Sequence, residues 1–300
     1  MFSDGGESVF QGLKTRTEGR EGLRGQHTLD MGLFWGFTPQ QHLLAFILGT
    51  PRLFMLMQTA PFMGGTVVTG QLRFTIVLAC YLVLHPMLLG QLPSWEGLAL
   101  ASGLHMAVLI LKEAFLGMLM GFLVGMMFWT LQCAGFFIDN QRGAGQATET
   151  DPLAGEQTSP TGSFFFQSAV YVFFSTGAFL TFLGTVYASY ECWPVTSVLP
   201  SGFFERPTLP LFFAQKVSDL ALDMMLLSGP VVVACLLTDI SLGLINRFAS
   251  QLNVYVLAMP VKSGLASLLL IFYFSMLMTG AVSMFDSFGS DLQYLQVLMP

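Results

Sequence analysis

Apolar residues gather in six long runs along the chain, and shorter polar stretches separate these runs. The runs span residues 41–60, 74–92, 98–138, 163–190, 211–247 and 261–285. A helix of about 20 mostly apolar residues is long enough to cross a membrane. The pattern therefore predicts an all-α, polytopic membrane protein with about six long hydrophobic helical segments.

Several of these segments are predicted to be bent or broken. Pro51-Arg52 lies in the first run and His85-Pro86 in the second, and Gly229-Pro230 is expected to kink the fifth. The third and fifth runs are too long for one simple crossing, because a helix of about 40 residues extends about 60 Å, twice the hydrocarbon thickness. Each could fold into a hairpin, for example at Lys112-Glu113, or could continue beyond the lipid while packed against other protein.

Polar regions set the expected boundaries of the membrane domain. Residues 1–30 mix both charge signs with glycine, which is typical of a disordered tail. We assign residues 31–290 to one membrane domain and residues 291–300 to a short C-terminal tail.

A polar interruption also precedes the last apolar run. Asn253, Pro260 and Lys262 lie there among apolar residues. A polar break followed by a short apolar run and a proline predicts a re-entrant or short surface element. Polar groups at membrane depth are costly against lipid, so we expect these three to be buried in protein or to face a partner subunit.

Composition supports the membrane assignment. The chain is 53% hydrophobic and 10% charged, whereas about 25% of residues are charged in ordinary soluble domains. The net charge is −6 and no basic run follows the first thirty residues, so no nucleic-acid partner is expected. The His and Cys spacings match no zinc site, and neither a phosphate-binding loop nor a nucleophile elbow is present. No metal, cofactor or catalytic residue is predicted.

The third run carries two features that indicate close packing. Lys112 and Glu113 are charged residues in apolar sequence, and adjacent residues on a helix point about 100° apart, so we expect them to have separate partners. Gly117, Gly121 and Gly125 recur every four residues and form a smooth stripe where another helix can approach. That helix could belong to this chain or to another subunit.

The longest polar stretch between two apolar runs is "FFIDNQRGAGQATETDPLAGEQTSPTG", residues 136–162. Its charges are comfortable in water but costly against lipid, and its glycines allow unusual backbone angles. Asp139 and Arg142 stand three residues apart, so they could pair across one turn and fix the root of the loop. A solvated connector without further function would have a similar composition. The candidate residues are Asp139, Asn140, Gln141, Arg142, Gly143, Gly145, Asp151, Pro152 and Gly155.

Four segments carry a resemblance to a known family. They are "FMLMQTAPF", "KEAFLGMLMGF", "AGFFIDNQRGAGQATETDPLAGEQTSPTGSF" and "DISLGLINRFASQLNVYVLAMPVKSG". In this order they resemble the SctT family, also called SpaR or YscT, of inner-membrane subunits of type III secretion export gates, with the flagellar counterpart FliR. The resemblance extends from about residue 40 to residue 285.

The resemblance implies a non-enzymatic structural and gating role in the bacterial inner membrane. Members of this family join R-type and S-type export-gate subunits in a helical assembly, and a U-type switch protein wraps around that assembly. Unfolded secreted proteins pass through its centre. The resemblance also implies that the loop matching residues 139–162 acts as a plug across the closed pore.

Two other function classes are open from the residues alone. A secondary transporter could use Lys112, Glu113 and the broken helices as an ion or substrate site. Transporters of this kind usually carry an internal repeat, and the two halves of this chain show no such similarity. A membrane-embedded enzyme would need a nucleophile or metal constellation, which the sequence lacks.

Overall fold

The computed structural model describes residues 37–64, 68–92, 103–143, 149–150, 157–197, 208–248 and 254–298. The tail expected at residues 1–30 lies outside this part of the chain. Five of the candidate residues also lie outside it: Gly145, Asp151, Pro152, Gly155 and Asn253.

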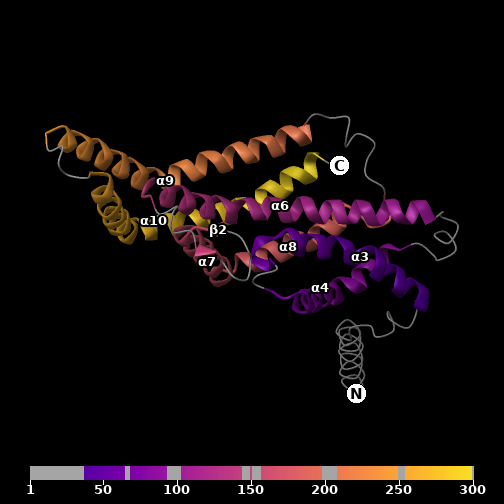
Figure 1. Cartoon of the computed structure of the whole chain (residues 1–300). Helices are drawn as coiled ribbons and strands as arrows, with labels where there is room; N and C mark the ends of the chain where they lie inside the picture. The colour runs from indigo at the N-terminus through magenta and orange to yellow at the C-terminus, as the bar shows by residue number, and fades with distance from the viewer. Residues whose placement is uncertain are drawn as a thin grey trace, which may run out of the picture.

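Helices cover all six predicted apolar runs, which confirms the all-α fold (Figure 1). The described elements are α3 (Pro39–Thr59), the short 3-10 helix η1 (Pro61–Met63), α4 (Gly70–Gln91), α6 (Gly103–Gln141), β1 (Glu149–Thr150), β2 (Gln157–Thr158), α7 (Pro160–Ser175), α8 (Ala178–Cys192), α9 (Thr208–Phe248) and α10 (Val254–Leu298). The two-residue strands pair antiparallel between α6 and α7.

Helix α6 is the central helix of the fold. It is one continuous helix of 39 residues, about 58 Å long at about 1.5 Å per residue. Lys112 and Glu113 do not break it, so the third run continues as a single packed helix and does not form a hairpin. Figure 1 shows α6 between α9 on one side and α3, α7 and α8 on the other, and it packs on α3, α7, α9 and α10.

The fourth apolar run is broken, which its hydrophobic pattern did not predict. Helix α7 ends at Ser175 and α8 starts at Ala178, with a bend of 73° between them. Gly177 adopts φ +79°, a left-handed conformation that suits glycine and ends a helix. This bend places both short helices against the rest of the core.

The last two helices form a long hairpin. Helix α9 has 41 residues and stays helical through Pro230, and α10 has 45 residues and stays helical through Pro260. The prediction of a separate re-entrant element around Pro260 is therefore wrong. A proline removes one internal hydrogen bond, but a continuous helix still satisfies the surrounding backbone within an apolar environment. Figure 1 shows the tip of this hairpin projecting beyond the other helices.

Helix α10 also extends further than the sequence pattern indicated. It runs to Leu298, so residues 291–298, which were expected to belong to a short tail, are helical. Asp291 in this stretch pairs with Lys216 of α9 at 2.7 Å, so the end of α10 contacts the beginning of α9.

An aromatic cluster joins η1 to three helices. The ring of Phe62 lies 5.0 Å from that of Phe173, 5.3 Å from that of Phe128 and 5.7 Å from that of Phe182, measured between centroids. All four side chains are almost fully buried. Aromatic pairs at such distances contribute beyond the area they bury, so this cluster holds η1, α6, α7 and α8 in one core.

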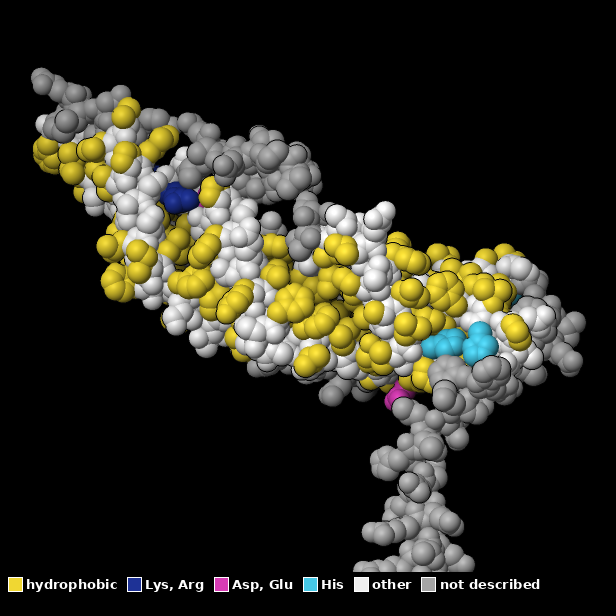
Figure 2. Space-filling view, turned by 90° about the horizontal axis from the view of Figure 1, so that it is seen from below, with side chains coloured by type: hydrophobic (Ala, Val, Ile, Leu, Met, Phe, Trp, Pro, Cys, Tyr) yellow, Lys and Arg dark blue, Asp and Glu magenta, His cyan; other side chains and the backbone are white. Residues whose placement is uncertain are grey.

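Four described helices are long and apolar enough to cross a membrane. These are α4, α6 and the greater parts of α9 and α10, and the bent α7–α8 pair would make a fifth span. Helix α3, which covers the first predicted run, is not among them. Figure 2 shows one face of the molecule on which apolar side chains predominate and charged ones are few. Such a surface suits lipid or other apolar protein.

Candidate functional site

The two ends of the polar loop are held together by one buried carboxylate. Asp139, near the end of α6, is 2% exposed. It accepts hydrogen bonds from the backbone N–H of Thr161 at 2.9 Å and from the Thr161 hydroxyl at 2.6 Å. Thr161 lies in the first turn of α7, so this contact closes the loop at its root.

Arg142 completes this root. Its Nη2 lies 2.6 Å from Oδ1 of Asp139 and donates to the Thr161 hydroxyl at 3.0 Å. The predicted pairing of Asp139 with Arg142 is thus confirmed. Charge-assisted hydrogen bonds of this kind are stronger than neutral ones, so these contacts hold the two ends of the loop together.

Three small residues that the sequence pattern did not single out make this closure possible. Ser159 caps α7 by accepting from the Gly162 N–H at 2.9 Å. Gly135 of α6 packs directly on Gly162, and a Cβ at Gly135 would come within 2.6 Å of the Gly162 nitrogen. The "SPTG" sequence places a serine directly before a proline of the first turn, which is a known signal for a helix start. This signal would have identified Ser159 as the cap from the sequence.

The remaining described residues of the loop lie at its two arms. Asn140 is exposed and Gln141 is partly buried at the end of α6. Gly143 adopts φ +80° and a Cβ there would lie 3.5 Å from Met259 of α10. Further along, Glu149 pairs with Thr158 and Thr150 with Gln157 in β1 and β2. The loop therefore leaves and re-enters the helical body as two adjacent arms.

A second polar cluster lies inside the core between α3, α6 and α8. Arg52 and Glu113 are fully buried and form a bidentate pair, at 2.7 Å and 3.0 Å. Arg52 also donates to the Ser189 hydroxyl at 3.0 Å and to the Trp193 carbonyl at 2.8 Å, and it stacks over the Tyr190 ring. The cluster links three helices that lie far apart in the sequence.

Lys112 takes part in the same cluster, which differs from the expectation of separate partners. Its Nζ lies 2.6 Å from Oε1 of Glu113 and donates to the carbonyls of Pro194 and Ser197, each at 2.9 Å. The long, flexible lysine side chain spans the angle that separates neighbouring positions on a helix. Two cations therefore share one carboxylate, and backbone carbonyls after α8 supply the remaining acceptors.

The glycine stripe of α6 faces α3 of the same chain. A Cβ at Gly117 would overlap the carbonyl of Arg52, and one at Gly121 would overlap the Thr59 hydroxyl. At Gly125 the nearest atoms belong to Trp129 and Pro61, at 3.1 Å and 3.3 Å. The helix that approaches the stripe is therefore α3, which belongs to this chain.

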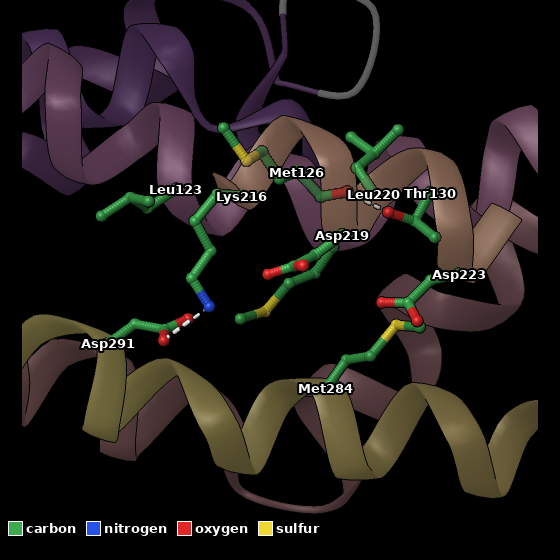
Figure 3. A pocket seen from close by; sticks show the side chains of 10 residues that line it. Leu123, Met126, Thr130, Lys216, Asp219, Leu220, Asp223, Met284 and Asp291 are labelled. Carbon is green, nitrogen blue, oxygen red and sulfur yellow. Dashed lines mark hydrogen bonds and ion pairs between the residues drawn. The ribbon is translucent and has the colours of Figure 1, made fainter. Parts of the chain in front are cut away.

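Charged residues of the hairpin pair across it. Lys262 of α10 contacts Asp239 of α9 at 2.9 Å, and Pro260 is exposed nearby. Figure 3 shows a small pocket between α6, α9 and α10, where Lys216 pairs with Asp291 and the carboxylates of Asp219 and Asp223 lie close by. These polar groups lie within otherwise apolar helices.

Comparison with known proteins identifies the kind of protein to which this arrangement belongs. Residues 43–288 match the family described as "Bacterial export proteins, family 1". The chain belongs to this family. With its several helices capable of crossing a membrane, it is a multi-pass protein of the bacterial inner membrane.

Individual relatives agree with the family. Yop proteins translocation protein T of Yersinia pestis is 39% identical over 243 residues, which cover 81% of this chain and 90% of that protein. Surface presentation of antigens protein SpaR of Salmonella typhimurium is 33% identical over 236 residues, or 78% of this chain and 84% of SpaR. Flagellar biosynthetic protein FliR of Bacillus subtilis is 32% identical over 167 residues, or 56% of this chain and 64% of FliR. The resemblance seen in the sequence is confirmed.

Proposed function

We propose that this protein is a non-enzymatic structural subunit of the type III secretion export apparatus, and that the loop between α6 and α7 gates the pore. The family supports the export role, and so do the relatives whose names refer to the translocation of Yop proteins and to the surface presentation of antigens. The observation that carries the gating role is the root at Asp139, which fixes both ends of the loop on the helical body.

A gate of this kind needs a rigid base and a movable polar segment. The base is provided by the buried contacts among Asp139, Arg142 and Thr161. The segment from residue 144 to residue 158 carries three acidic residues, Glu149, Asp151 and Glu156, which are stable in a watery vestibule and costly against lipid. A substrate that displaces this segment would leave the root in place.

The partners that fit this role are the R-type and S-type export-gate subunits, the U-type switch protein, and unfolded secreted proteins in transit. The α9–α10 hairpin offers the surface for the subunits, because large apolar side chains such as Ile271 and Phe272 are 77% and 78% exposed on it. Within a membrane, a partner would hold such side chains by close van der Waals packing.

The transporter alternative relied on Lys112 and Glu113 as a substrate or ion site. Both side chains are engaged in contacts with Arg52 and with the backbone after α8, so they provide no open site. This geometry favours the structural role.

The export role is tested by isolating the chain from membranes of cells that express it with the R-type and S-type subunits. We expect those subunits to co-purify with it, and substitution of Ile271 and Phe272 by serine should reduce their recovery at least about fivefold, because apolar contact area is lost. Serine at Leu104, which is 76% exposed on α6, is the matched control. A stable monomer that transports a solute would instead support the transporter.

A further inference from the structure

One buried arginine has no counter-charge among the residues that the structure describes. Arg73, in the first turn of α4, is 7% exposed. Its Nη1 donates to the side-chain oxygen of Gln58 and its Nη2 approaches the Val68 carbonyl at 3.5 Å, while its Nε has no acceptor. Within the described residues, no carboxylate lies within 4.0 Å of it. Arg52 is also buried but has Glu113.

The surroundings of Arg73 increase the positive potential. The guanidinium reaches back toward Val68, before the start of α4, and so lies beside the N-terminus of that 22-residue helix. A helix N-terminus carries a partial positive charge and unpaired N–H groups. No acidic residue lies in the first turn, and the side chain of Thr69 makes no capping bond. Gly70 and Gln71 are exposed, so the start of α4 lies at the surface of the described part of the chain.

The position of Arg73 along α4 indicates where the anion comes from. Helix α4 is apolar and 22 residues long, which is about 33 Å and matches the hydrocarbon thickness of about 30 Å. A crossing by α4 would place its first turn at the level of the lipid headgroups. Leu72 and Phe74, on either side of Arg73, are 59% and 50% exposed and would contact acyl chains. Gln58, which covers the guanidinium, is itself exposed, so its movement opens access.

We propose that Arg73 and the N-terminal amides of α4 bind the phosphate group of a phospholipid, which displaces the side chain of Gln58. A phosphate diester accepts hydrogen bonds from Nε and Nη of arginine together and from backbone amides at a helix start. The anion neutralises a buried cation for which the described part of the chain supplies no carboxylate. This site is independent of the gating loop.

The test measures lipid binding by the purified full chain in detergent with native mass spectrometry. The probes are phosphatidylglycerol, diacylglycerol with the same acyl chains, and inorganic phosphate. We expect Arg73→Gln to weaken phosphatidylglycerol binding about tenfold, as the loss of charge-assisted hydrogen bonds implies. Arg247→Gln, at an exposed arginine of α9, is the matched control and should change binding less than twofold.

A second variant keeps the test decisive if Arg73→Gln does not fold. Gln58→Glu places a carboxylate beside the guanidinium and should lower phosphatidylglycerol binding to a similar extent while the thermal unfolding temperature stays equal or rises. Unchanged phosphatidylglycerol binding in both variants would overturn the proposal. Equal binding of diacylglycerol and phosphatidylglycerol would show that only the acyl chains are recognised, and binding of inorganic phosphate without binding of phosphatidylglycerol would show a free phosphate site. Either result would overturn the lipid assignment.

Discussion

The core around α6 and the α9–α10 hairpin differ in how much of their apolar surface is buried within this chain and in how well their charges are paired. Half of the most apolar stretch of α6 is buried, against 22% for α9 and 17% for α10. Glu113 of α6 is fully buried with two cationic partners, whereas Asp239 of α9 is 42% exposed and has Lys262 as its one ion-pair partner among the described residues. The helices resemble each other in length and apolar character, so composition alone does not explain the difference.

The difference indicates that the two regions have different roles. Helix α6 packs most extensively on α3 and α7 of the same chain, and its charged side chains are paired deep inside the core. The hairpin exposes apolar side chains, which suit lipid or apolar protein, and partly exposed ion pairs, which lipid alone accommodates poorly. The first region therefore forms the packed core and positions the loop that we propose as the gate, and the second offers the surface that we propose for the other subunits.

The largest effect is expected from removal of the shared carboxylate. Glu113→Ala leaves Arg52 and Lys112 buried without their counter-charge, so the chain should lose about 3–5 kcal/mol of stability. Thermal unfolding of the purified chain and its abundance in membranes measure this loss. Glu191→Ala, on the exposed side of α8, serves as a control with little effect. A variant of Glu113 that unfolds like the wild type would contradict the internal role of the cluster.

A smaller loss is expected when the close approach of α3 and α6 is blocked. Gly121→Leu forces a side chain against Thr59 and the carbonyl of Leu56, and such overpacking costs about 1–3 kcal/mol. Less export-gate complex should then be recovered on native gels. Gly243→Leu is the matched control, because nothing lies within 4 Å of a Cβ at that position of α9. Equal unfolding temperatures of the two isolated variants would show that the stripe is not packed inside the chain.

The root of the loop should respond locally. Asp139→Ala leaves the Thr161 N–H and the Arg142 guanidinium without their acceptor, at a cost of about 1–3 kcal/mol. We expect faster hydrogen exchange at residues 160–163 and a mild leak through the assembled gate. Asn140→Ala changes the exposed neighbour and should do neither. Unaltered exchange in the Asp139 variant would show that the root does not depend on this carboxylate.

The smallest effect is expected in the hairpin. Asp239→Ala breaks the pair with Lys262, and exposed pairs of this kind contribute about 0–1 kcal/mol. The unfolding temperature of the isolated chain should hardly change. A loss as large as that of Glu113→Ala would remove the distinction between the two regions.

The sequence pattern predicted the helices well because an apolar helix is encoded by residues that follow one another in the sequence. It also predicted the pairing of Asp139 and Arg142, which lie one turn apart. It did not predict the contact of Arg52 with Glu113, which are 61 positions apart, because such pairs depend on how whole helices pack. The packing of Gly135 on Gly162 was missed for the same reason.

Two local predictions were wrong because they depended on the environment of the residues, which the pattern of apolar and polar positions does not specify. Pro260 was expected to stand before the last helix but lies within α10, since an apolar environment favours a continuous helix despite one missing hydrogen bond. Lys112 and Glu113 were expected to have separate partners but contact each other, because burial and the long lysine side chain outweigh the angle between adjacent positions.

The gating role of the loop is tested most directly by shortening it. The contact between Asp139 and Thr161 keeps the two ends of the loop close, so a brief Gly/Ser linker can replace residues 144–158 without pulling α6 and α7 apart. Leak of small ions or dyes is measured in cells, with the abundance of the complex determined in parallel. A Gly/Ser segment of the original length separates the effect of length from that of sequence. We predict a normal amount of complex that leaks with the shortened loop, and a shortened complex as tight as the wild type would contradict the gating role.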